Sequence, residues 1–103
     1  MKSAKKGFIE AQAKAGYMYK NGIGTKQNYK KSIIWFTKAG KKGHLKAQEE
    51  LAQLYTFQDE IANREKAIKW INIYIENPKT TKNQKNSAKL LLYTIKTLTP
   101  NNK

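Results

Sequence analysis

The chain has 103 residues and a net charge of +14, from 21 basic and 7 acidic side chains, with 39% hydrophobic residues and no cysteine. This length fits one domain, the hydrophobic content is that of a folded protein, and the lack of cysteine excludes disulfides and thiolate metal ligands. No apolar run approaches the roughly 18–20 residues that cross a bilayer, so we expect no membrane insertion.

The positive charge has two explanations, which the sequence leaves open. A field of this sign attracts nucleic acid, anionic lipid or acidic protein surfaces. Alternatively, a genome rich in A and T supplies lysine, isoleucine and asparagine together, and the chain is rich in all three. Arg64 is the only arginine, which favours the second explanation, because phosphate-reading sites prefer the bidentate arginine fork.

The chain repeats itself from its first residues. Lys-Lys-Gly at residues 5–7 recurs at residues 41–43, and Tyr19 recurs as Tyr55, both at an offset of about 36 residues, within the range of helical solenoids. Residues 1–7 therefore match the end of a second helix and the turn after it. We expect them to be the end of a preceding repeat or an N-terminal cap.

Residues 8–42 form the first predicted unit, a helix, a turn and a second helix. Apolar side chains recur at helical spacing from Phe8 to Tyr19 and again around Ile33 and Phe36. Between them, Gly22 and Gly24 can take the positive φ that ends a helix, and Asn28 is a candidate N-cap for the next one. We call the two helices of a unit the A helix and the B helix.

Residues 43–77 form the second predicted unit. Its A helix carries Leu51 and Tyr55, its B helix is capped by Asn63, and Asn77-Pro78 ends it. The loop between the two helices lacks the glycines of the first unit, so we expect it to be helical or tight. Residues 78–103 are predicted to hold a fifth helix, from about Thr81 to Leu98, as a third half-repeat or a cap.

Small residues predict where the helices of a hairpin approach closely. Gly16 and Ala52 would provide these contacts on the A helices, with Ser32 and Ala67 on the B helices. The two tryptophans, Trp35 and Trp70, are expected to fill the space between hairpins.

These features resemble the Sel-1-like repeat, a bacterial and eukaryotic relative of the tetratricopeptide repeat. The matching positions of the first unit are Ala11-Gln12, Gly16, Tyr19, Asn21-Gly22-Ile23-Gly24, Lys31-Ser32, Trp35-Phe36, Lys38-Ala39 and Gly43. The resemblance covers about residues 2–77. It implies an all-α fold, an α–α superhelix of stacked helix-turn-helix repeats with about five helices, that acts as a protein–protein interaction module or scaffold.

Catalysis is not expected, because titratable side chains are sparse. His44, the only histidine, is expected to be a surface or capping residue, and Glu49 and Glu50 point about 100° apart on one helix. The charges of Asp59-Glu60 suit a helix start. The chain is therefore predicted not to be an enzyme, with no catalytic residue, cofactor or metal.

In tetratricopeptide-like stacks the A helices line a concave groove, and this resemblance implies a binding face on them. The residues expected there are Glu10, Ala13, Tyr17, Lys20, Lys46, Glu49, Gln53 and Thr56. Tyr17 lies two positions from Tyr19, off the apolar stripe, and is expected to be exposed. A separate basic ridge is expected from Lys5, Lys6, Lys41 and Lys42.

Binding is thus the predicted function. The leading hypothesis is a protein or peptide partner with acidic character, held on the concave face of a monomer. The alternative is nucleic acid or another polyanion bound by the basic ridge. The segment has no export signal of its own, which predicts the cytoplasm, or an exported or periplasmic location if it belongs to a longer protein with a signal peptide.

Overall fold

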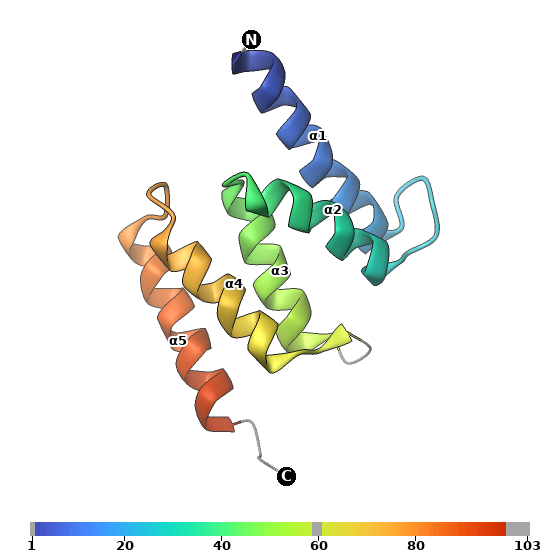
Figure 1. The fold of residues 1–103 in the computed structure, drawn as a ribbon. Helices are drawn as coiled ribbons and strands as arrows, with labels where there is room; N and C mark the ends of the chain where they lie inside the picture. The colour runs from blue at the N-terminus through green and yellow to red at the C-terminus, as the bar shows by residue number, and fades with distance from the viewer. Residues whose placement is uncertain (1, 59–60, 99–103) are drawn as a thin grey trace.

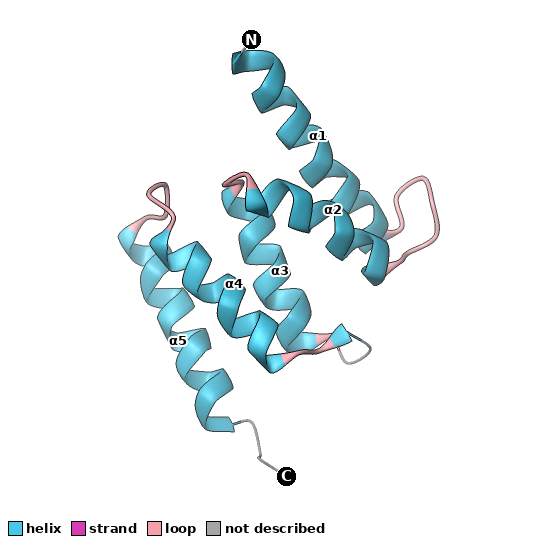
Figure 2. Cartoon of the chain, viewed as in Figure 1, coloured by secondary structure: helices cyan, strands magenta, loops and turns pink. Residues whose placement is uncertain are grey.

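The computed structural model describes residues 2–58 and 61–98, and the side chains of 7–58 and 61–97. In these ranges the chain is helical, without strands, which confirms the all-α prediction (Figures 1 and 2). The helices are α1 (Lys2–Asn21), α2 (Tyr29–Lys41), α3 (Leu45–Phe57), α4 (Arg64–Glu76) and α5 (Lys82–Leu98).

The helices stack in chain order. α1 packs against α2 and α3 against α4, forming two hairpins, while α2 contacts α3 and α4 contacts α5 (Figure 1). α1 and α3 are therefore the A helices of the two units and α2 and α4 their B helices, and α5 follows α4 as an A helix would. The result is an elongated molecule of 46 × 33 × 18 Å, as expected for a stack in which each repeat packs on its neighbouring repeats.

The predicted helix boundaries are confirmed by their caps. Gly22 and Gly24 have φ of +69° and +72° after α1. The Asn28 Oδ1 accepts from the Lys31 N–H at 3.0 Å, and Asn63 does the same with Lys66 at 2.9 Å, which satisfies backbone donors that a helix start leaves unpaired.

The turn expected at residues 5–7 is wrong. α1 runs through Gly7 without a break, whereas its repeat partner Gly43 lies in a turn with φ of +92°. The turn at Gly43 is held by bonds from distant side chains: the amide of Asn77 donates to the Gly43 carbonyl at 3.1 Å, and that of Gln48 to the Gly40 carbonyl at 2.9 Å. Residues 2–7 continue the helix because alanine and lysine favour it.

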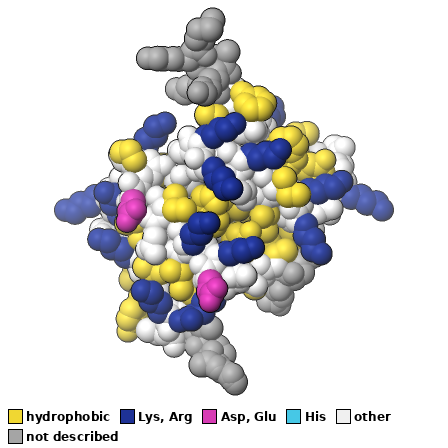
Figure 3. Space-filling view, in the orientation of Figure 1, with side chains coloured by type: hydrophobic (Ala, Val, Ile, Leu, Met, Phe, Trp, Pro, Cys, Tyr) yellow, Lys and Arg dark blue, Asp and Glu magenta, His cyan; other side chains and the backbone are white. Residues whose placement is uncertain are grey.

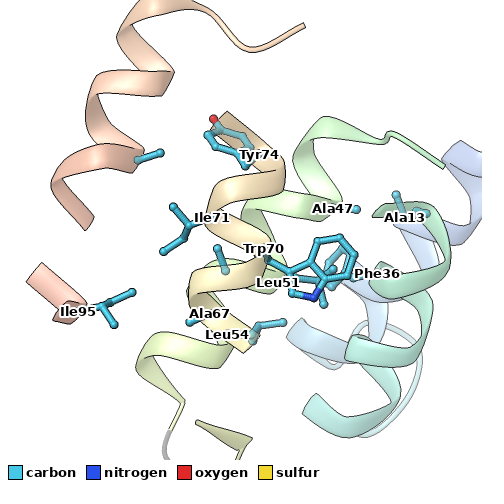
Figure 4. Close-up of a cluster of buried hydrophobic side chains, with 13 residues drawn as sticks. Ala13, Phe36, Ala47, Leu51, Leu54, Ala67, Trp70, Ile71, Tyr74 and Ile95 are labelled. Carbon is cyan, nitrogen blue, oxygen red and sulfur yellow. The ribbon is translucent and has the colours of Figure 1, made fainter. Parts of the chain in front are cut away.

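The small-residue contact predicted for the first hairpin exists, and an aromatic ring fills the space beside it. Phe36 is fully buried against Gly16, where a Cβ would lie 2.7 Å from the ring. The Ser32 hydroxyl donates to the Gly16 carbonyl at 2.8 Å. Trp70 is 4% exposed and packs on Gly40, between the two hairpins (Figure 4).

The expectation for Trp35 is wrong. Its side chain is half-buried and lies outside the core, beneath the Lys38 ammonium at 5.0 Å. The neighbouring ring, Phe36, takes the inward position instead, because adjacent residues of a helix point about 100° apart.

The last helix begins with a capping box. The Thr81 hydroxyl accepts from the Gln84 N–H at 3.2 Å, and the Gln84 side chain accepts from the Thr81 N–H at 2.9 Å. Ala88 and Ile95 are buried and pack α5 against the core.

Between α3 and α4, the described residues are in line with the tight connection expected there. Thr56 and Phe57 are still helical, and Asp59-Glu60 lie outside the described residues. Among the described helices, none is long and apolar enough to cross a membrane.

Candidate partner-binding face

The surface formed by α1, α3 and α5, called here the A-helix face, carries two recesses lined by described residues. Each lies between successive A helices. The first, called here the α3–α5 groove, has a volume of about 240 Å³. The second, between α1 and the start of α3, is a shallower and wider recess of about 340 Å³ and is called here the α1–α3 recess.

The α3–α5 groove has an apolar floor and a mostly uncharged polar rim. Its lining is Glu49, Ala52, Gln53, Ile71, Tyr74, Asn83, Gln84, Ser87, Ala88 and Leu91. Ala52 and Ala88 leave the space open because they are small, and Ile71 from α4 lies behind them. Glu49 is the only charged side chain in this lining. The groove is therefore suited to an uncharged or apolar group.

The predicted residues fall into both recesses. Glu49 and Gln53 line the α3–α5 groove, whereas Glu10 and Tyr17 line the α1–α3 recess. Lys46 is in the lining of neither recess, and its ammonium donates to the Glu49 carboxylate at 2.9 Å. This hydrogen bond raises the pKa of Lys46.

Two residues expected on this face are less available than predicted. Ala13 is 2% exposed and belongs to the core. Tyr17 is half-buried, and its ring meets the Phe36 ring edge-on, with centroids 5.3 Å apart. Burial raises the pKa of Tyr17, and the negative charge of Glu50 adds to this. The expectation that Tyr17 is exposed is wrong, because its ring reaches the core from the edge of α1.

Lys20 and Glu50 form a partly buried ion pair between the two hairpins. The Lys20 Nζ lies 2.5 Å from the Glu50 Oε1, with side chains 28% and 6% exposed. Lys20 is thus committed to an internal contact rather than free on the surface. The role of Glu50 was not predicted from the sequence. The spacing along the helix indicates that Glu50 is buried, because it stands three residues after Ala47 and four before Leu54, on the buried side of α3.

His44 confirms its expected capping role. Its Nδ1 accepts from the Ala47 N–H at 3.1 Å at the start of α3, and its Nε2 lies 3.2 Å from the Glu10 carboxylate. The residue thereby joins α1 to α3 at the α1–α3 recess. The described part of the chain contains no group of three or more acidic or histidine side chains able to hold a metal ion.

Only half of the predicted basic ridge can be placed. Lys41 and Lys42 lie at the end of α2, and the Lys42 ammonium lies 4.8 Å from the centre of the Phe8 ring. The side chains of Lys5 and Lys6 lie outside the described residues. The ridge as a continuous feature therefore stays a prediction.

Comparison with protein families identifies these hairpins. The model of the Sel1 repeat matches residues 9–44 and 45–72. The chain belongs to the Sel1 repeat family. The two matched segments lie within the α1–α2 and α3–α4 hairpins, beginning inside α1 and ending inside α4, and α5 follows them. No curated protein and no solved structure gives a significant match.

Family membership sets the general class of activity. Sel1 repeats are non-catalytic helical repeats that mediate interactions between proteins. This agrees with the protein–protein interaction module implied by the resemblance in the sequence.

Proposed function

We propose that this Sel1 repeat protein holds a segment of a partner protein on its A-helix face, with one bulky uncharged side chain of the partner in the α3–α5 groove. The observation that carries the proposal is the lining of the groove. Apolar side chains form its floor, and the amides of Gln53, Asn83 and Gln84 form its rim.

The size of the groove favours a peptide side chain. Sites for small molecules and cofactors usually measure about 300–1,000 Å³, and the groove, at about 240 Å³, is smaller. Amide side chains both donate and accept hydrogen bonds, so Gln53 and Asn83 can pair with the N–H and C=O groups of an extended peptide. The amide nitrogen of Gln84 can donate, while its oxygen accepts from Thr81. The proposed occupant is therefore a side chain with its own backbone lying across the rim.

Charge acts outside the groove in this proposal. The groove lining contains no lysine or arginine, whereas the whole chain carries +14. A field of this sign raises the association rate of segments with acidic residues beside the inserted side chain. The proposed partner thus combines acidic character with an uncharged anchor, and the protein acts without catalysis and as a monomer.

The proposal is tested with displayed random peptides selected on the immobilised protein. Ser87 is exposed at the groove, and Ser87→Trp should fill it and weaken the selected peptides by about tenfold or more, the loss expected for a central anchor. Asn72→Trp is the matched control, because Asn72 is exposed on α4, which contributes only Ile71 and Tyr74 to the groove. Fluorescence anisotropy measures the affinities.

Equal binding to both variants would contradict the groove as the site. Failure to select any peptide would contradict the proposal as a whole. Circular dichroism of both variants should match that of the unchanged protein, since both substituted side chains are exposed.

The alternative of a nucleic acid on the basic ridge remains a second proposal. It is supported by the position of Lys41 and Lys42 together at the end of α2. A salt titration of binding to random DNA tests it, because several phosphate contacts give a steep dependence of affinity on salt. Undetectable binding at low salt would contradict it.

A further inference from the structure

The outward face of α2 carries an exposed isoleucine among lysines. Ile34 is 53% exposed. Lys30, Lys31, Lys38 and Lys41 stand four and three residues before it and four and seven after it, which places them on the same side of the helix. Ser32, Phe36, Ala39 and Gly40 are buried on the opposite side. We call the exposed set the α2 lysine face.

No negative charge of α2 balances this face. Residues 11–48 contain neither aspartate nor glutamate. Among the described residues, the ion pairs join Lys20, His44 and Lys46 to carboxylates of α1 and α3, and none includes a lysine of α2. Figure 3 shows the side of the molecule on which α2 and α4 lie in front, with many basic side chains around apolar patches and few acidic ones.

The helix dipole accounts for only half of these lysines. Lys38 and Lys41 stand in the last turn of α2, where the dipole favours positive charge, whereas Lys30 and Lys31 stand in the first turn, where it disfavours positive charge. Lys31 and Lys38 lie over the rings of Tyr19 and Trp35, at 5.5 and 5.0 Å. These contacts hold the side chains along the protein surface, so the charges are positioned for an external anion.

The exposed Ile34 indicates which anion. An aliphatic side chain makes no favourable contact with the charged phosphates of a nucleic-acid backbone. Stacking of bases on a protein needs aromatic faces that no other side chain covers. On this face, lysine ammonium groups already lie over the rings of Tyr19 and Trp35. At an anionic bilayer surface, by contrast, an apolar side chain enters the headgroup layer while surrounding lysines meet lipid phosphates.

We propose that the α2 lysine face docks peripherally on anionic lipid surfaces, with Ile34 in the headgroup layer. This face lies on α2, apart from the residues that line the α3–α5 groove. The docking is therefore independent of the proposed partner site, and the molecule can present a partner at a membrane surface. Each lysine contributes roughly a fivefold factor to the partition coefficient.

The test measures co-sedimentation of the full chain with phosphatidylcholine vesicles, with and without phosphatidylserine. Binding is expected only with phosphatidylserine and should fall as salt is raised. Replacing Lys30, Lys31, Lys38 and Lys41 by glutamine should lower the partition coefficient by roughly a hundredfold or more, by the same estimate. The matched control replaces Lys82, Lys85, Lys89 and Lys96 of α5 by glutamine, which changes the net charge equally.

A second pair of variants separates lipid from other polyanions. Ile34→Ser should weaken vesicle binding several-fold, whereas Ile23→Ser, at a residue that is 55% exposed after α1, should not. Equal losses for the α2 and α5 lysine variants would overturn the proposal, because binding would then follow net charge alone. Binding to a single-stranded oligonucleotide but not to vesicles, lost with the α2 lysines and unchanged by Ile34→Ser, would overturn it in favour of nucleic acid.

Discussion

The contact between Gly16 and Phe36 makes a quantitative prediction about packing. A methyl group at position 16 would lie 2.7 Å from the ring of Phe36, which is fully buried. We expect Gly16→Ala to destabilise the protein, because overpacking a core costs about 1–3 kcal/mol. The intrinsic preference of a helix for alanine over glycine returns roughly 0.5–1 kcal/mol. The net loss should be at most about 2.5 kcal/mol, with a fall in Tm of roughly 4–8 °C for each kcal/mol lost.

The same helix offers a control for helix propensity. Gly7 lies in α1, and no atom lies within 4 Å of the place that a methyl group would take there. Gly7→Ala should therefore leave stability unchanged or raise it by up to about 1 kcal/mol. Urea denaturation followed by circular dichroism measures both variants. If Gly16→Ala proves as stable as Gly7→Ala, the close contact with Phe36 is refuted.

The second repeat suggests how the defect can be repaired. At the positions of Gly16 and Phe36 it carries Ala52 and Ile71, a larger residue on the A helix and a smaller one on the B helix. Phe36→Ile should relieve the clash in Gly16→Ala, so the double variant should be more stable than the sum of the single losses predicts by about 1–2 kcal/mol. Additive losses would show that the two side chains do not meet.

Two further predictions concern equivalent glutamines and a tyrosine. The Gln48 amide donates to the Gly40 carbonyl and accepts from Asn77, whereas the buried Gln12 Oε1 accepts no hydrogen bond from the described groups. Gln48→Met should therefore cost about 1–3 kcal/mol in urea denaturation and Gln12→Met close to nothing, and equal costs would contradict this difference. Burial and the Glu50 charge raise the pKa of Tyr17 above the ordinary 10.0, so the folded state retains a proton that the unfolded state loses, and stability should fall as the pH rises above 10. Tyr17→Phe should reduce this fall, and an unchanged pH profile would contradict the assignment.

The repeat pattern predicts the hairpins because it is a local signal. Helical spacing and the asparagines at 28 and 63 require only neighbouring residues, and both caps form as expected. The turn at residues 5–7 fails for the opposite reason. The same Lys-Lys-Gly sequence is part of the helix in α1 but ends in a turn at Gly43. The turn is stabilised by hydrogen bonds from the side chains of Gln48 and Asn77 to backbone carbonyls of residues 40 and 43.

The binding face was harder to predict than the fold. Tyr17 and Lys20 stand on the expected side of α1, but a neighbouring helix decides what they contact: Phe36 of α2 meets Tyr17, and Glu50 of α3 meets Lys20. Helical spacing gives the direction of a side chain and not the distance to the next element. The α3–α5 groove could not be predicted from the sequence either, because its shape depends on how α5 is placed beside α3.

The lysines of α5 bear on whether the helix is a half-repeat or a cap. Aligning α3 and α5 at their N-caps, His44 and Thr81, pairs Gln48 with Lys85 and Ala52 with Lys89. In α3 these two positions are buried, and Gln48 bonds to Asn77 at the end of α4.

A sixth helix packed on α5 as α4 packs on α3 would bury Lys85 and Lys89. Burial of their charges is costly in the absence of acidic partners. Terminal repeats of solenoids expose a polar outer face. The lysines at this edge of α5 therefore favour the interpretation of α5 as a cap over that of a third half-repeat.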